Sequence, residues 1–165
     1  MREIRLKTVV VVLAAVVGGV ACGPQQSLTE EQRGALEGEV AVFVDSLFAA
    51  MNTHDVDAIA AHYDQTEAFT YVGCTSIRTG FESLRRVMEA YYPSNPEVSF
   101  EHDVATTRIL DRQDAVATVT AATGDDVTLY WSFVLRRGDA GEWRITHEHE
   151  SWPECPAPRS HPSLD

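Results

Sequence analysis

Two histidines near the end of the chain, His147 and His149, are two residues apart in the run Trp143–Trp152. This run is rich in β-branched and aromatic residues, so alternation along a strand places both imidazoles on one face with Trp143 and Ile145. Two imidazoles on one face can move protons or ligate zinc. A metal needs at least a third ligand, and no spacing supplies one, so the sequence favours no metal site.

Acid–base chemistry is the other reaction type for which the chain has suitable groups. Apolar enclosure shifts the pKa values of carboxyl and imidazole groups and lets them work as acids and bases near neutral pH. No motif pairs these groups, so hydrogen-bonded residues of a pocket or core are the simpler alternative. The candidate acid–base residues are Tyr63, Asp64, Tyr71, His102, Tyr130, His147 and His149.

The start of the chain predicts export. Residues 1–7 carry three cations, and residues 8–21 are apolar and end in small side chains, which is typical of a secretory signal. The stretch Val20-Ala21-Cys22-Gly23 resembles the lipobox of bacterial lipoproteins, in which the cysteine takes a lipid. We therefore expect a lipoprotein anchored to a membrane through Cys22 and facing the periplasm or the cell exterior. Cleavage without lipidation is the alternative.

The cysteine count agrees with a lipid at Cys22. The chain has three cysteines, so lipidation leaves Cys74 and Cys155 as an even pair. An oxidising compartment favours a disulfide bond between them. A reactive thiol at Cys74 is the alternative.

Charge excludes several partners. Removing residues 1–21 takes away three of 13 cations and one of 25 acidic residues, which leaves 10 and 24 and a formal charge of −14. Such a surface repels nucleic-acid phosphates and anionic lipid headgroups. The only lysine, Lys7, lies in the signal, so the remaining chain has no lysine for Schiff-base chemistry.

Changes in hydrophobic period predict an α+β domain. The spacing is helical up to Pro96, and it then becomes the two-residue period of strands separated by short polar turns. Short connections imply antiparallel neighbours, and the helices must cover one face of the sheet. The predicted helices are 29–52, about nine residues from Asp55, and one opened by a capping box at Thr79–Glu82 and ended by Pro93 and Pro96; the predicted strands are 68–72, 98–110, 115–122, 127–136 and 143–152.

The strand 127–136 is apolar on both faces. Leu129, Trp131, Phe133 and Leu135 share one face, and Tyr130, Ser132 and Val134 share the other. We expect the bulkier face to point to the interior. The pattern alone does not decide which face lines a pocket.

Three local patterns resemble one family. Residues Phe48–Asp57 resemble its first-helix end, Arg78–Leu84 its glycine-led third helix, and Trp143–Ser151 its last strand. On these patterns and the order of elements, residues 29–152 resemble the SnoaL-like branch of the nuclear transport factor 2-like superfamily. The expected division of the chain is a signal peptide (1–21), a lipidated tether (22–28), this domain (29–152) and a disordered proline-rich tail (153–165).

The resemblance implies a cone-shaped curved sheet wrapped around three helices, with a pocket at its open end. It also implies a pocket lined by Tyr71, His102, Trp131, His147 and His149, with no cofactor. Fold does not decide function in this family. Three functions stay open: binding of a small, largely apolar ligand, cofactor-free isomerase, cyclase or dehydratase activity, and assembly, including a homodimer through the outer sheet face. The position at which the isomerases hold a tyrosine is Phe48 here.

Overall fold

The computed structural model describes residues 27–74, 76–124 and 127–153, in which three helices and six strands form an α+β unit. The predicted order of elements is confirmed, with one addition. A short strand that the sequence pattern did not indicate follows the first strand and forms a hairpin with it. The elements are α1 (Glu30–Thr53), α2 (Val56–Ala60), β1 (Thr70–Gly73), β2 (Ser76–Thr79), α3 (Phe81–Ser94), β3 (Phe100–Ile109), β4 (Asp114–Thr123), β5 (Thr128–Arg137) and β6 (Trp143–Ser151).

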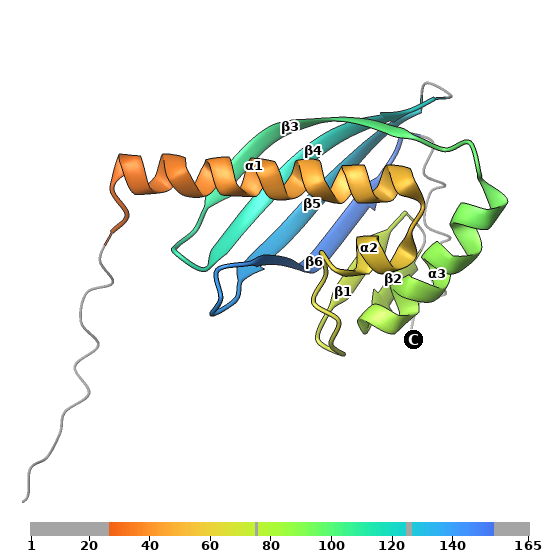
Figure 1. Cartoon of the computed structure of the whole chain (residues 1–165), viewed down its shortest axis with the longest axis horizontal. Coiled ribbons are helices and arrows are strands. Elements are labelled where there is room, and N and C mark those ends of the chain that lie inside the picture. Colours follow the sequence, from red (N-terminus) through yellow and green to blue (C-terminus); the bar gives the residue numbers. More distant parts are fainter. Residues whose placement is uncertain (1–26, 75, 125–126, 154–165) are drawn as a thin grey trace, which may run out of the picture.

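The strands form one curved, open sheet in the order β2-β1-β6-β5-β4-β3 (Figure 1). The run from β3 to β6 is antiparallel throughout, as its short turns predict. One pairing, between strands that no short turn joins, is parallel: β1 runs in the same direction as β6. Helix α3 and several strands separate these two strands in the chain, so no tight turn fixes their relative direction.

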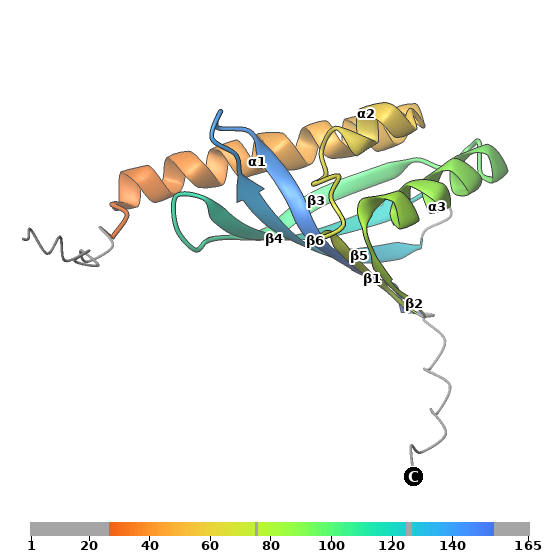
Figure 2. The ribbon, with the colours of Figure 1, turned by 90° about the horizontal axis from the view of Figure 1, so that it is seen from below.

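All three helices lie on one side of the sheet, as the apolar stripes require (Figure 2). Helix α1 begins with the predicted capping box. The Gln32 backbone N–H donates to the Thr29 hydroxyl oxygen, and the Thr29 N–H donates to the Gln32 side chain, both at 3.1 Å. The buried stripe of α1 is Leu36, Val40, Val44, Leu47 and Phe48, and the partly buried Phe43 and Met51 pack against the same core.

The predicted capping box at the start of α3 is wrong. Thr79 is the last residue of β2, and the cap residue is Gly80, with φ of 76° and no side-chain cap bond. Only glycine adopts such a φ without strain. The Ser83 hydroxyl donates to the Gly80 carbonyl at 2.8 Å, and this bond stabilises the N-terminal end of α3. Pro93 lies in the last turn of α3, close to the predicted end.

Strand β5 confirms the expected orientation of its faces. The bulkier side chains Leu129, Trp131, Phe133 and Leu135 are buried against the helices, and Tyr130 is 47% exposed on the other face. Strand β4 alternates in register with it, so that its buried positions are alanines and a valine, which leave room for the aromatic rings of β5.

Some of the sequence-based predictions concern residues outside the described ranges. These are the signal segment 1–21, the lipid site Cys22, most of the tether, the tail 154–165 and Cys155, so the Cys74–Cys155 disulfide stays a prediction. Within the described residues, no helix combines the length and the apolarity needed to cross a membrane.

Candidate functional site

A β-bulge in β6 decides which side chains face the interior. Leu135 of β5 lies opposite Ile145, but the next residue, Val134, lies opposite His147, so Thr146 is an extra residue. The Ile145 backbone also hydrogen-bonds to the segment that follows α2. Its N–H donates to the His62 carbonyl, and its carbonyl accepts from the Asp64 N–H, each at 2.9 Å. One extra residue reverses the faces of everything that follows it.

The bulge overturns the expected placement of the two histidines. Before it, Trp143 and Ile145 point inward; after it, the inward residues are Glu148 and Glu150. His147 faces outward, where its Nδ1 lies 2.6 Å from the Thr70 hydroxyl. His149 is exposed on the same outer face. Neither histidine lines the cavity described below, so the pocket role predicted for them is wrong.

Of the other three predicted pocket residues, one lies outside the cavity and two line it. His102 stacks on Phe48 with ring centroids 4.3 Å apart, and its Nε2 lies 2.9 Å from Asp45 Oδ1, so it does not line the cavity. This partner and ring contact explain its position without chemistry. Tyr71 and Trp131 line the cavity, and their role in ligand binding stays a prediction.

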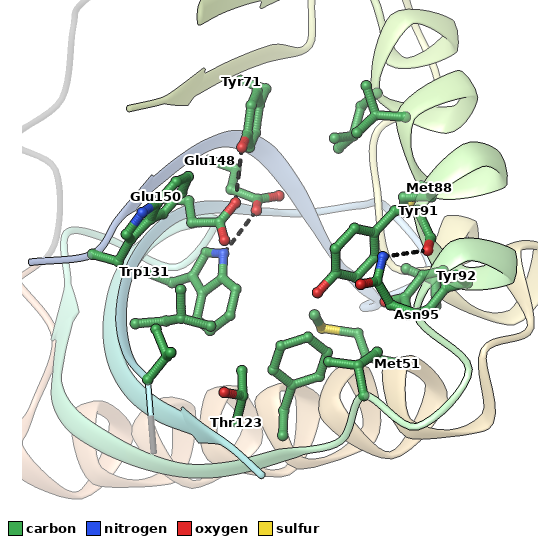
Figure 3. Close-up of a pocket in the computed structure, with 18 of the residues that line it drawn as sticks. Met51, Tyr71, Met88, Tyr91, Tyr92, Asn95, Thr123, Trp131, Glu148 and Glu150 are labelled. Atoms are coloured by element: carbon green, nitrogen blue, oxygen red, sulfur yellow. Dashed lines mark hydrogen bonds between the residues drawn. The ribbon is translucent and has the colours of Figure 1, made fainter. Parts of the chain in front are cut away.

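The cavity has a volume of about 620 Å³ and lies between α3, the end of α1 and the inner face of the sheet. Figure 3 shows Tyr71, Trp131, Glu148 and Glu150 on one side and Tyr91 and Tyr92 across from them. Its walls are mainly apolar and aromatic. The aromatic lining residues are Tyr63, Tyr71, Tyr91, Tyr92, Phe100, Trp131 and Trp152.

Glu148 is the buried acid of this wall, with only 5% of its surface exposed. The Tyr63 hydroxyl donates to its Oε2 at 2.8 Å, and the Trp131 Nε1–H donates to its Oε1 at 3.0 Å. Three elements therefore hold one carboxyl: the segment after α2, β5 and β6. Such bonds fix the orientation of the group and leave one further acceptor site on each oxygen.

Glu150 is the second acid, on the same face of β6 and two residues further along. The Tyr71 hydroxyl of β1 donates to its Oε2 at 2.8 Å. Gly73 makes room for this phenol, because a Cβ at position 73 would lie 2.6 Å from the Tyr71 hydroxyl oxygen. The parallel pairing of Tyr71 with Glu148 brings β1 into the site.

Burial controls the electrostatics of both acids. Loss of solvent and the charge of Glu150 raise the pKa of Glu148 to about 8, against the opposing effect of the bonds from Tyr63 and Trp131. Burial also raises the pKa of Glu150, and the Tyr71 bond opposes that shift. Burial and the nearby carboxylates raise the pKa values of Tyr63 and Tyr71, so both phenols stay protonated and donate.

This arrangement suits proton transfer. A carboxyl whose pKa is near 8 can hold or release a proton at physiological pH. In the part of the chain that the structure describes, no three histidine, cysteine or acidic side chains stand close enough together to hold a metal ion.

Glu148 and Glu150, the two acids of the site, are not among the residues that the sequence predicts for it. The pattern indicates the strand that carries them, and their spacing of two residues indicates a shared face. Strict alternation places Glu148 and Glu150 on the face opposite Trp143 and Ile145, which is the solvent face. No residue type in Trp143–Ser151 indicates the bulge that reverses this assignment. Among the other acid–base candidates, Tyr63 belongs to the site, Tyr130 lies on the outer face, and Asp64 accepts from the Thr66 N–H in a turn.

The comparison with known proteins supports the fold. Residues 40–154 match the family model of the SnoaL-like domain, whereas no curated protein matches the chain. Similar solved structures include an NTF2-like protein of unknown function from Pseudomonas putida (20% identity, TM-score 0.61, 73% of this chain and 88% of that one). Another is a ketosteroid isomerase-like protein from Erwinia carotovora atroseptica (16%, 0.58, 76% and 98%).

A third structure is a putative calcium/calmodulin-dependent protein kinase II association domain from Xanthomonas campestris (24% identity, TM-score 0.56, 70% of this chain and 87% of that one). At these identities the likeness concerns the fold alone. The curved, unclosed sheet with helices on one side is the fold that these structures share with this chain. The family match covers most of the described residues, so the chain belongs to the SnoaL-like domain family.

Proposed function

We propose that this protein is an exported lipoprotein, anchored through Cys22, whose domain binds a small, largely apolar molecule in the cavity. The cavity is the observation that supports ligand binding. Ligand sites typically enclose roughly 300–1,000 Å³, with mainly apolar walls and a few convergent polar groups. The volume of about 620 Å³, the aromatic lining and the two carboxyls on one wall fit that description.

A cavity-filling variant tests ligand binding. Val87 of α3 lines the cavity, so Val87→Trp should fill part of it, whereas Val42→Trp changes a side chain that is 68% exposed and lies outside it. Nile red, a neutral dye that fluoresces in apolar surroundings, serves as the probe. We expect Val87→Trp to abolish dye binding and Val42→Trp to retain it. Equal binding by both folded variants would contradict the proposal.

Acid–base catalysis is the second candidate, and the raised pKa of Glu148, about 8, favours it. A Glu148 carboxylate in an apolar cavity could remove the α-proton of a β,γ-unsaturated ketone and return that proton to the γ-carbon. The conjugated product is followed by its ultraviolet absorbance. We expect kcat/KM to rise with pH up to about 8 and to vanish in Glu148→Gln. Dye binding without any turnover of such ketones would contradict catalysis and support ligand binding only.

Assembly remains a weaker alternative. The outer sheet face carries Tyr130, His149 and other half-exposed side chains, which suits a homodimer through this face. The expected disulfide between Cys74 and Cys155 would connect the end of β1 to the tail beyond β6. The mass of the protein in solution tests the homodimer. Its mobility under non-reducing conditions tests the disulfide.

A further inference from the structure

The wall of the cavity carries acidic groups without a basic counterpart. Among the described residues, the lining includes the carboxyls of Glu97, Glu148 and Glu150 and no arginine, lysine or histidine. Glu97 is exposed at the rim, whereas the other two lie inside. A charge taken out of water requires a partner of opposite charge or must be neutralised by a proton.

The bonds inside the site do not supply that partner. Tyr63 and Trp131 donate to Glu148, and Tyr71 donates to Glu150, and all three donors are neutral. The second oxygen of Glu150, Oε1, accepts no hydrogen bond from the described residues, and it is not sealed from solvent. The site therefore orients two acids but leaves acceptor capacity open towards the cavity.

The other elements around the two acids also contribute no cation to the cavity. Among the residues described, helix α3 presents Tyr91 and Tyr92, and the segment after it presents Glu97. Arg78 lies opposite Tyr71 on the neighbouring strand β2. Its charge acts on Tyr71 only as the smallest of the effects on that phenol, and Arg78 does not line the cavity.

We propose that the occupant of the cavity is an organic cation: an ammonium group near Glu148 and Glu150, attached to an apolar body that contacts the aromatic walls. This inference rests on the proposed binding function and names the class of ligand. Trp131 and Tyr71 line the cavity beside the acids, and aromatic rings attract a cation more than a neutral or anionic group. Fatty acids and other anions are disfavoured at pH values at which the acids are ionised, because their carboxylates would then meet groups of the same sign.

Cation binding should displace protons. A bound cation stabilises ionised Glu148 and Glu150, whose pKa values burial has raised in the empty protein. Below those pKa values the acids must lose a proton before the ion pair forms. Affinity for a permanently charged ligand therefore falls as the pH is lowered from about 8, and protons are released to the buffer on binding. Tyr63, Tyr71, Tyr91 and Tyr92 stay protonated throughout this range.

A matched set of probes tests the charge preference on the whole protein. Benzyltrimethylammonium and neopentylbenzene have the same shape and differ by one positive charge, and 4-phenylbutanoate provides an anion of similar size. We expect the cation to bind roughly tenfold or more tightly than its neutral counterpart, and the anion not to bind. Calorimetry in two buffers of different ionisation enthalpy measures the released protons.

Neutral substitutions identify the acids responsible. Glu148→Gln and Glu150→Gln keep the size of the side chain, and we expect both to lose the cation preference and the proton release while still binding Nile red. Glu101→Gln, on an exposed residue outside the cavity, should keep the preference. Retained dye binding shows that a variant still folds with an open cavity.

The outcomes separate this inference from the binding function. If the neutral probe binds the wild-type protein as tightly as the cation, the cation preference is wrong and the binding function stands. If neither the probes nor Nile red bind, the binding function itself fails. A cation preference that survives in both glutamine variants would assign the charge recognition to some other group and overturn the proposed site.

Discussion

Glu148 has an unusual acidity because of its surroundings, since a glutamate on a strand face is normally solvated. Three neighbours create those surroundings: Trp131 covers one oxygen, Tyr63 covers the other, and Glu150 adds charge repulsion. The two bonds favour the ionised form, but burial outweighs them. The sequence contains each of these residues, yet nothing in it reveals that they meet.

This burial predicts that Glu148 makes the folded protein less stable as the pH rises, the opposite of what a carboxyl with a lowered pKa does. A carboxyl whose folded pKa is raised binds its proton more tightly in the folded protein than in the unfolded chain. Its penalty is absent below pH 4.5 and grows until about pH 8, so the free energy of unfolding decreases over that range. A difference of one in pKa between the folded and unfolded states corresponds to about 1.4 kcal/mol, so we expect a decrease on the order of a few kcal/mol. Glu150 acts in the same direction.

Urea unfolding at pH 5 and pH 8 measures this effect. Glu148→Gln should lose most of the decrease, because its amide can still accept from Trp131 and donate to the Tyr63 oxygen without ionising. Glu101→Gln is the matched control and should behave as the wild type does. Parallel pH dependences for wild type and Glu148→Gln would show that Glu148 is not desolvated in the folded protein.

At the scale of elements, the sequence predicts the helices and long strands well, because their periods of 3.6 and 2 are direct consequences of backbone geometry. The four strands of the meander lie within about two residues of their predicted bounds. Pairings between distant segments are a different matter. The parallel contact of β1 with β6 and the bulge at Thr146 depend on tertiary neighbours, namely the segment His62–Asp64 that bonds to Ile145. The identity of the site residues depends on those two features.

The bulge itself can be removed without reversing the faces. Deleting Thr146 leaves Ile145 opposite Leu135 and His147 opposite Val134, so Glu148 and Glu150 still point inward. We expect a folded protein that binds Nile red and has lost about 1–2 kcal/mol of stability. Circular dichroism and dye titration provide the measurement.

The control deletion removes Ser132 in β5, where the pairing with His149 is regular. That change must turn every following residue of the strand to the opposite face, and we expect it to prevent folding. A Thr146 deletion variant that is equally unfolded would show that the bulge residue is essential to the sheet.

At the scale of the whole molecule, the predicted lipid at Cys22 would decide where the domain works. The capped start of α1 follows closely on the predicted tether, so a lipid at Cys22 would hold the domain near a membrane surface. Without residues 1–21 the formal charge is 10 − 24 = −14, which keeps such a domain from adhering to anionic headgroups. The anchor is then the sole attachment that the sequence predicts.

Replacing Cys22 tests that attachment. Cys22→Ser removes the acceptor of the lipid, so we expect the protein to move from the membrane fraction to the soluble fraction. Fractionation followed by immunoblotting measures the distribution, and Cys74→Ser serves as the control that retains the anchor. Unchanged membrane association of Cys22→Ser would contradict lipidation at that residue.

The positions of the tryptophans have a practical consequence. Of the three in the chain, Trp131 and Trp152 line the cavity, and Trp131 donates to Glu148 through its indole nitrogen, whereas Trp143 donates to Glu39 instead. The emission of an indole responds to nearby charge and to displaced water. The protein thus contains a built-in optical reporter, whose colour and brightness record whether the chamber is filled and whether its acid is ionised, with no label attached.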